Sequence, residues 1–392
     1  MDFGFNEEQE RFRVEVREFL QKELTPEFWQ GLGTKPPEDQ EYSQEFSRKL
    51  ASRGWLGIGW PQEYGGQGRP YTDQLVCAEE IAYHRAPILY HFWAVDLAGP
   101  VLIGVGSEDL KKAYVPGILA ADINFCIGFT EPEAGSDLAS LQARAVADGD
   151  DYVINGQKMF ISLAHKADYC LLAARTNFEA PKHRGISLFV LDMKAPGVNV
   201  SPTPTMGDML ASTVYLDSVR VNKDALVGEI DRGWYHLAIC LDHERIFVGA
   251  LVARRRRMFD ELVEYVRSTR RNGRLLNENP HIRNNLAQIG IELDVGRLLS
   301  YRTAWLLEKG AIPFAEASMT KVLTSELDQR LTNFGVNVLG LHGQLKQGSK
   351  WVPLQGRMEQ AYRVSILESI GGGTNEIQRS IIALMGLGLP RD

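Results

Sequence analysis

The sequence predicts a multidomain α+β protein whose chain passes through helices, then strands, then helices again. Apolar residues recur with helical spacing in the first and last thirds, whereas the middle carries short β-branched and aromatic runs separated by Gly, Pro, Asn and Asp. The length of 392 residues also exceeds what one hydrophobic core usually organises. We therefore expect an N-terminal helical domain at 1–122, a middle β-domain at 123–232 and a C-terminal helical bundle at 233–392.

The N-terminal part is expected to contain three helical segments. Helical spacing at 6–24 is expected to place Phe12, Val14, Val16, Phe19 and Leu20 on or near one face. Helical spacing returns at about 72–86 and 107–119. A glycine-rich stretch followed by Pro70 separates the first two segments, because both residue types interrupt helices.

The middle part is expected to be built of short strands. Five runs rich in β-branched and aromatic residues predict strands at 152–154, 169–172, 186–191, 198–200 and 213–216. From 233 onward long helical segments return, with breaks expected near Asn272-Gly273 and near Gly340.

Charge and cysteine content exclude several classes of function. A net charge of -7 argues against nucleic acid as a partner, since a phosphate-binding surface is normally basic. Four widely spaced cysteines form no CxxC pair, so we expect neither a metal site nor a disulfide framework. The acidic N-terminus lacks the pattern of a signal peptide, and no stretch has the ~18 apolar residues of a membrane span. A cytoplasmic location is therefore predicted.

A glycine turn, residues 371–373, precedes a predicted helix near the C-terminus. Three adjacent glycines indicate a turn that needs positive φ or the close approach of another molecule. Thr374, Asn375 and Glu376 then place polar groups at a helix N-terminus, where unpaired N–H groups favour anionic or electron-rich ligands. Taken alone, the pattern fits either an ordinary turn or a site for a phosphate or flavin.

A charged cluster interrupts the first helix predicted after 233. Asp242, His243, Glu244 and Arg245 stand within an otherwise apolar segment. A carboxylate that faces a core is costly unless it is paired. Glu244 therefore either pairs with a cation such as Arg245 or lies in a cavity and performs chemistry.

Three segments in order, 125–139 with its Thr130-Glu131-Pro132 motif, 154–162 and the glycine turn, resemble the acyl-CoA dehydrogenase family. The resemblance covers essentially the whole chain. It implies the acyl-CoA dehydrogenase fold, with a β-barrel-like middle domain and a C-terminal four-helix bundle. It also implies FAD-dependent α,β-dehydrogenation of an acyl-CoA thioester to a 2-enoyl-CoA, with an electron-transferring flavoprotein as electron acceptor.

The resemblance also indicates where the catalytic base lies. Many members carry it in a Tyr-Glu-Gly-Thr pattern, but Gly372 stands at the matching position here. In the isovaleryl- and long-chain-type branch the base stands in a Glu-Arg pair, which Glu244-Arg245 matches. Glu244 is then expected to abstract the α-proton while the Gly372 N–H and a flavin ribityl hydroxyl bind the thioester oxygen and hydride passes to flavin N5. Glu368 is a rival base, although a solvated or salt-bridged role at the end of a helix suits it better.

The remaining site residues follow from the same resemblance. Phe160 and Ser162 match an aromatic-X-hydroxyl pair against the flavin, although Phe160 alone would equally suit core packing. Arg270 or Arg271 would reach the FAD pyrophosphate of a neighbouring subunit, since the direct match falls on Thr269. The cofactor set is Phe129, Thr130, Ser136, Phe160, Ser162, Arg270, Arg271, Thr374 and Glu376, and the substrate set is Ser136, Asp242 and Arg245.

Segments 59–66 and 129–141 are similar to bacterial members that act on steroid side chains, so a branched, alicyclic or steroid acyl group is possible. Such members suggest an α2β2 assembly with a related subunit, beside the homotetramer or dimer. Two other functions stay open: a flavin oxidase or monooxygenase on the same fold, and a non-catalytic subunit. The arginine run at 254–257 is interpreted as a solvated helix face rather than a CoA-phosphate site.

Overall fold

The structure is a computed structural model that describes residues 4–36 and 39–390, without the side chains of residues 90 and 238–248. The chain forms two compact units. The helical unit comprises Met1–Thr25, Pro70–Ala86 and Arg245–Asp392, and the sheet unit comprises Pro26–Arg69 and Pro87–Glu244. Because the units interleave along the chain, the three domain boundaries expected from the sequence stay a prediction.

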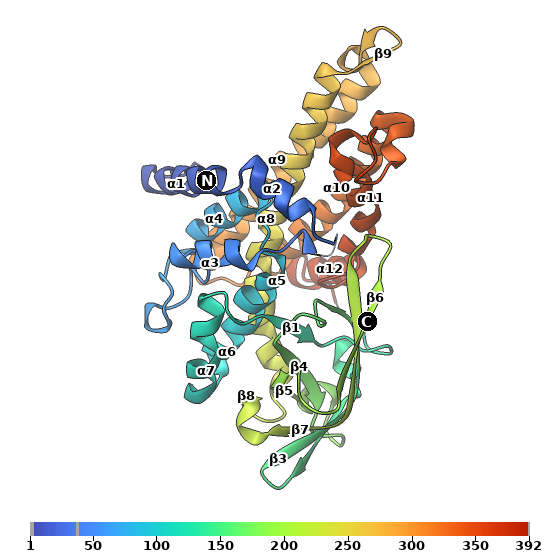
Figure 1. Ribbon diagram of the computed structural model, residues 1–392. Coiled ribbons are helices and arrows are strands. Elements are labelled where there is room, and N and C mark those ends of the chain that lie inside the picture. The colour runs from blue at the N-terminus through green and yellow to red at the C-terminus, as the bar shows by residue number, and fades with distance from the viewer. Residues whose placement is uncertain (1–3, 37–38, 391–392) are drawn as a thin grey trace. The chain divides into compact units, whose positions relative to one another are not determined.

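The sheet unit begins with short helices and continues into strands (Figure 1). The helices are α2 (Pro26–Gly33), α3 (Gln44–Ser52), α5 (Leu89–Phe92), the π-helix η3 (Trp93–Ala98), α6 (Gly99–Val105) and α7 (Glu108–Leu119). The strands are β1 (Phe125–Gly128), β2 (Arg144–Asp148), β3 (Asp151–Ser162), β4 (Tyr169–Arg175), β5 (Ile186–Asp192), β6 (Val198–Pro204), β7 (Leu210–Asn222) and β8 (Leu226–Val227). Every strand segment expected from the sequence lies within one of these strands.

The strands form one sheet in the order β6-β7-β3-β2-β4-β5-β8, with β1 parallel to β4. Strands β3 and β7 pair in an antiparallel register that shifts twice, between Ile154 and Gly156 and again between Lys158 and Ile161. Ile154, Val214 and Leu216 point into the buried core of the sheet. The alternation of buried and exposed residues along β7 matches a strand with one covered face.

The helical unit contains most of the long helices. Its elements are α1 (Glu7–Glu23), α4 (Tyr71–Tyr83), most of α8 (Gly233–Ser268), α9 (Pro280–Glu308), α10 (Phe314–Leu339), α11 (Arg357–Glu368) and α12 (Asn375–Ile381). Residues of α8, α9, α10 and α11 share one core, represented by Leu262, Leu293, Leu331 and Met358. This shared core confirms the helical bundle expected from the sequence.

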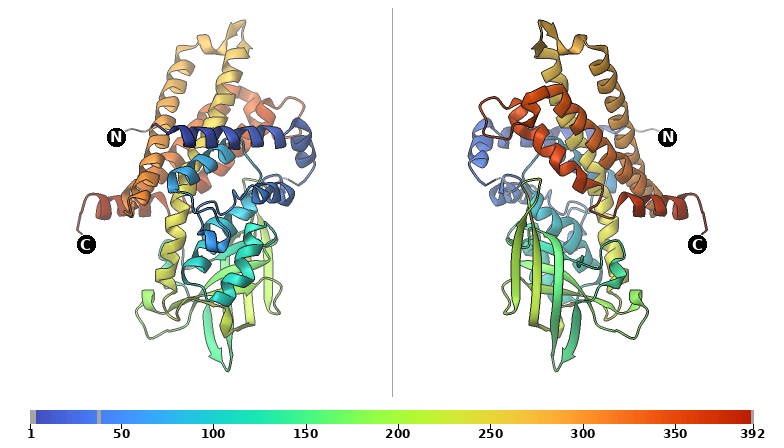
Figure 2. Two further views of the ribbon diagram at one scale, coloured as in Figure 1. Left: turned by 90° about the vertical axis from the view of Figure 1, so that its left-hand side faces the viewer. Right: turned by 90° about the vertical axis from the view of Figure 1, so that its right-hand side faces the viewer.

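Local sequence explains where the helices begin and end. Asn6 caps α1 in a capping box with Gln9, and Asn279 caps α9 directly before Pro280. Both views of Figure 2 show α8 and α9 running side by side to a hairpin, formed by β9 (Arg270–Arg271) and β10 (Arg274–Leu275). Asn272 and Gly273 turn this hairpin with positive φ, and Gly340 ends α10 in the same way.

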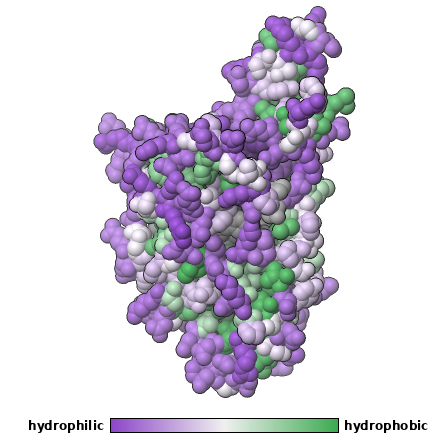
Figure 3. All heavy atoms as spheres, in the orientation of Figure 1, coloured by the Kyte–Doolittle hydropathy of each residue, from purple (hydrophilic) through white to green (hydrophobic). Residues whose placement is uncertain are grey.

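The face shown in Figure 3 is mainly hydrophilic, with hydrophobic residues in separate groups. Within the described residues, no helix is both long enough and apolar enough to cross a membrane.

Candidate active site

The sheet unit brings four of the predicted residues together, and we call Phe129, Thr130, Phe160 and Ser162 the bulge site. Phe129 and Thr130 directly follow β1, whereas Phe160 and Ser162 lie at the end of β3. The two segments are joined by a backbone hydrogen bond of 2.9 Å, in which Met159 N–H donates to the Thr130 carbonyl. Residues about 30 positions apart in the sequence are therefore neighbours.

Phe160 has the most unusual backbone in the bulge site. It lies at the second register shift of β3, with φ of +59°, and its residue is 66% exposed. A bulky residue in the left-handed region costs about 1–3 kcal/mol, and such strain is found mainly at functional sites. The exposed ring contradicts ordinary core packing and suits stacking against a planar ligand.

A buried ion pair lies directly behind the bulge site. Lys158 Nζ donates to Glu131 Oε1 at 2.7 Å and to the Phe129 carbonyl at 3.1 Å. Burial lowers the pKa of Lys158, and the Glu131 carboxylate opposes this shift. Sequence analysis missed this pair, because Lys158 stands in a strand with no pattern that marks it as buried.

Ser136 lies at the exposed part of a loop that closes on itself. The Glu131 carboxylate accepts from Gln142 N–H at 2.6 Å and from Ala143 N–H at 2.9 Å. Buried Arg175 donates to the Leu141 and Ala139 carbonyls at the far side of the loop. The loop base is therefore fixed by charged side chains while Ser136 remains accessible.

The glycine turn has the left-handed backbone that its sequence predicts. Gly372 and Gly373 have φ of +64° and +81°, so the turn does need positive φ. Thr374 is the N-cap of α12, with its hydroxyl accepting from Ile377 N–H. Asn375 is buried and accepts from Lys321 Nζ at 2.8 Å and Ser325 Oγ at 3.1 Å, which fastens the turn to α10.

The Gly372 N–H faces no acceptor within the described part of the chain, while the Gly372 carbonyl accepts from Gln378 Nε2 at 3.0 Å. A backbone donor without a protein partner in an ordered turn is available to a ligand oxygen. The oxygen-binding role of Gly372 itself stays a prediction.

The two other carboxylates near the turn have defined surroundings. Hydrogen bonds from its own backbone N–H and from the Thr374 hydroxyl lower the pKa of the exposed Glu376 carboxyl. Glu368 ends α11 and forms an ion pair of 3.1 Å with Arg255 Nη2. The salt-bridged role favoured for Glu368 is therefore observed.

The two candidate pyrophosphate arginines differ in their contacts. Arg271 Nη2 donates to the Val338 carbonyl at 2.6 Å, and its guanidinium packs against Gly340. Arg270 makes a local hydrogen bond of 3.0 Å to the Gly273 carbonyl within the hairpin turn. Arg270 is thus the arginine that can leave its partner at little cost.

Three predicted residues, Asp242, Glu244 and Arg245, lie on α8, which is a continuous helix through this segment. Their side chains lie outside the described residues. Their roles therefore stay predictions that rest on the sequence.

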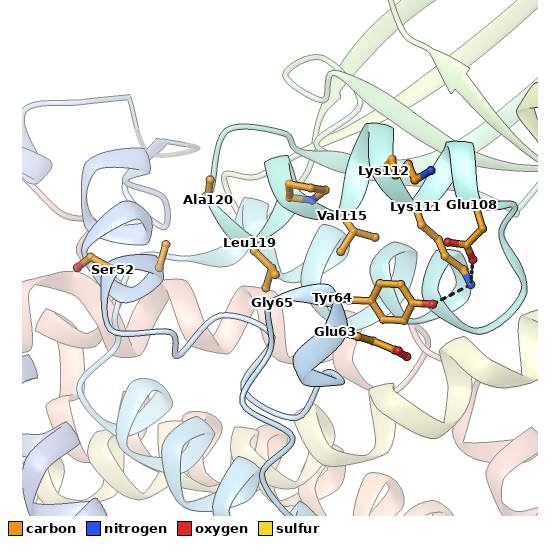
Figure 4. Close-up of a pocket in the computed structure, with 12 residues that line it drawn as sticks. Ser52, Glu63, Tyr64, Gly65, Glu108, Lys111, Lys112, Val115, Leu119 and Ala120 are labelled. Atoms are coloured by element: carbon orange, nitrogen blue, oxygen red, sulfur yellow. Dashed lines mark hydrogen bonds and ion pairs between the residues drawn. The ribbon is translucent and has the colours of Figure 1, made fainter.

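A separate pocket of about 800 Å³ lies in the sheet unit between the end of α3, the 3-10 turn Gln62–Tyr64 and α7. Figure 4 shows Lys111 reaching Glu108 and Tyr64 across its rim, at 2.9 and 3.1 Å. None of the predicted site residues lines this pocket.

Comparison with known proteins identifies the family. The N-terminal, middle and C-terminal domain models of acyl-CoA dehydrogenase match residues 6–122, 126–219 and 231–386. Acyl-CoA dehydrogenase FadE26 of Mycobacterium tuberculosis is 37% identical, over 100% of this chain and 99% of that protein.

Two solved structures share the whole fold. The Tcur3481-Tcur3483 steroid ACAD superimposes with a TM-score of 0.92 at 39% identity, and the ChsE4-ChsE5 complex from Mycobacterium tuberculosis with 0.91 at 36%. Each match covers 100% of both chains. The chain therefore belongs to the acyl-CoA dehydrogenase family, whose members are FAD-dependent oxidoreductases.

Proposed function

We propose that this enzyme removes the α-proton and the β-hydrogen of an acyl-CoA thioester, with Glu244 as the base. The observation that carries the proposal is the glycine turn. Gly372 has no side chain that could act as a base, and its N–H has no acceptor among the described residues. The turn thus suits oxygen binding, and the proton acceptor must come from another element.

Glu244 is the carboxylate that best fills this role. Its neighbour in sequence is Arg245, as in the branch of the family that carries the base on this helix. The rival Glu368 is held by Arg255, whose guanidinium is buried in the helical unit. Burial opposes the charge of Arg255, but the Asp328 and Glu368 carboxylates hold its pKa above the usual value. The ion pair with Arg255 therefore favours a structural role for Glu368 over that of the base.

In the proposed reaction, the Gly372 N–H donates to the thioester oxygen and stabilises the enolate character that develops there. Glu244 accepts the α-proton as a positioned general base. Bound FAD supplies the acceptor for the β-hydrogen and its electron pair. The residues of this chain contribute positioning, proton transfer and charge stabilisation.

The bulge site fits one face of a flavin. Phe160 is an exposed aromatic residue, Ser162 lies two positions later in the same strand, and Thr130 lies on the neighbouring segment after β1. In the helical unit, Thr374 and Glu376 stand at the N-terminus of α12. Their proposed role, taken from the family resemblance, is to bind near the adenosine half of the cofactor. Ser136, Asp242 and Arg245 are proposed to contact the substrate.

The acyl group is proposed to be bulky, of the branched, alicyclic or steroid kind. Support comes from the 39% identity over full length to a steroid ACAD. An electron-transferring flavoprotein is the proposed electron acceptor, and the cytoplasm is the proposed location.

The α9 helix supports assembly with further subunits. Four apolar residues with helical spacing, Ile291, Val295, Leu298 and Trp305, are each at least 41% exposed in the single chain. A stripe of this kind usually marks a protein interface. We propose that it is covered by another subunit, either in a homotetramer or dimer or in an α2β2 assembly with a related chain. The second arrangement has support from the similarity to ChsE4-ChsE5, which is a complex of two differently named chains.

The test is anaerobic flavin bleaching by a panel of straight, branched, alicyclic and steroid acyl-CoAs, with the chain purified alone and with a related subunit. Bleaching by bulky substrates with slow reoxidation in air is expected. Rapid reoxidation by oxygen would indicate an oxidase instead. Absence of bleaching by every substrate in both preparations would refute the dehydrogenase proposal.

A further inference from the structure

The ion pair between Glu131 and Lys158 is almost fully buried. Lys158 is 0% exposed and Glu131 is 6% exposed, although both lie next to partly exposed residues of the bulge site. Replacing a buried ion pair by apolar residues is often neutral or stabilising. Stability alone therefore does not explain why the chain buries these two charges here.

The contacts of the pair show what it holds. Lys158 Nζ donates to the Glu131 carboxylate and to the Phe129 carbonyl. These two residues directly precede and follow Thr130, so Lys158 holds the Thr130 segment at both of its neighbours. Glu131 in turn closes the 131–143 loop through the N–H groups of Gln142 and Ala143. One ammonium group thus links the Thr130 segment, the loop of Ser136 and strand β3.

The same lysine stands immediately before the strained bulge. Phe160, two residues later, is in the left-handed region, and the register of β3 against β7 shifts between Lys158 and Ile161. Gly156, two residues earlier, has φ of +148°, and a Cβ there would come within 2.7 Å of Ala143 Cα. Strand β3 is therefore fixed on one side of the bulge by close packing against the loop end and by the ion pair.

We propose that Glu131 and Lys158 are positioning residues that hold the Thr130 segment and the Phe160 bulge in one arrangement, and so set the affinity and the reduction potential of the flavin. This inference rests on the proposed function of the bulge site. It does not require either residue to touch the flavin. A strained bulge persists only where its surroundings determine it, and this pair is the charged contact that joins the two segments.

The test uses the full-length enzyme with two variants. Lys158→Met keeps a long unbranched side chain and removes the charge. Glu131→Gln removes the negative charge and keeps one side-chain oxygen, which can accept from one of the two loop N–H groups. The matched control is Arg175→Met. Arg175 is also a buried cation of this loop, but it binds Ala139 and Leu141 rather than the Thr130 segment. FAD affinity, midpoint potential, flavin visible circular dichroism and thermal unfolding are measured for each.

We expect Lys158→Met to weaken FAD binding about 10- to 100-fold, the scale of a lost charge-assisted contact, and to change the potential and the dichroism. Glu131→Gln should shift the same three quantities in the same direction by less. Arg175→Met should lower the unfolding temperature and should weaken FAD binding at least about fivefold less than Lys158→Met does. Wild-type affinity, potential and dichroism in Lys158→Met, or equal losses in Arg175→Met, would overturn the inference.

A flavin-free measurement separates this inference from the proposed function. In the apo enzyme, hydrogen exchange at Met159, whose N–H binds the Thr130 carbonyl, should accelerate in Lys158→Met and in Glu131→Gln but not in Arg175→Met. Unchanged exchange in the first two variants would overturn the positioning role. A wild-type enzyme that binds no FAD would instead refute the function of the site. If Lys158→Met does not fold, hydrogen exchange and FAD affinity in Glu131→Gln alone test the positioning role.

Discussion

Substitution of Asn375 by Ala should loosen the glycine turn without unfolding the bundle. Asn375 Oδ1 accepts from Lys321 Nζ at 2.8 Å and from Ser325 Oγ at 3.1 Å in a buried position. A hydrogen bond to a charged group contributes about 1.5–3 kcal/mol and a neutral one about 0.5–1.5 kcal/mol. The turn and α12 should therefore lose about 2–4 kcal/mol of local stability, and the Gly372 N–H its fixed direction.

The assay is native-state hydrogen exchange of the peptide that covers residues 369–381. Since 1.4 kcal/mol corresponds to a factor of ten, exchange should accelerate roughly 30- to 700-fold in Asn375→Ala. Ser318→Ala is the graded control. It removes one neutral contact between α10 and α12, the 2.7 Å bond from Ser318 Oγ to Gln378 Oε1, and should accelerate exchange roughly 2- to 12-fold. Equal exchange in wild type and Asn375→Ala would show that the contacts do not hold the turn.

Three further predictions concern single residues. Arg270→Ala should weaken FAD retention in a dialysis assay about 10- to 100-fold. Arg271→Ala, which loses its hydrogen bond to an α10 carbonyl, should mainly lower the stability of the fold. Greater loss of FAD in Arg271→Ala than in Arg270→Ala would exchange the two roles. Phe160→Gly should raise the free energy of unfolding by about 1 kcal/mol, because glycine adopts the positive φ without strain. The same variant should bind the flavin more weakly, and stronger flavin binding would contradict the stacking role. Burial lowers the pKa of His91, so below about pH 6.5 the unfolded state takes up a proton that the folded state does not. Stability should fall as pH drops from about 6.5 toward that lowered pKa, by at most about 1.4 kcal/mol per pH unit, and this slope should be smaller in His91→Gln in urea titrations; equal slopes would refute it.

The elements of this fold could be predicted well from the sequence, because their signals are local. Strand β5 is a run at 186–191 that is apolar except for Ser187. The left-handed Gly372 and Gly373 follow from the cost of placing three glycines together. The break at Asn272-Gly273 and the cap at Thr374 are likewise set by the residues themselves.

Contacts between distant segments could not be predicted in the same way. The run at 254–257 was expected to be a solvated face, yet Arg255 is 3% exposed and lies 3.5 Å from Asp328, a residue 73 positions away. Lys158 and Glu131 are 27 positions apart, and each is a charged residue that would ordinarily be expected at the surface. Such pairs depend on which elements pack together, and hydrophobic periodicity does not encode this.

Glu244→Gln tests the central claim most directly, because it keeps the size and hydrogen bonding of the side chain while removing the proton acceptor. Mixed anaerobically with an acyl-CoA that bleaches the wild-type enzyme, the variant should still bind the thioester and perturb the flavin spectrum. Flavin reduction should slow by at least ~100-fold, the scale of a general base. Glu368→Gln, measured beside it, should reduce its flavin at close to the wild-type rate. Near wild-type reduction in Glu244→Gln would contradict the assignment of the base, and loss of reduction in Glu368→Gln would move that role to the end of α11.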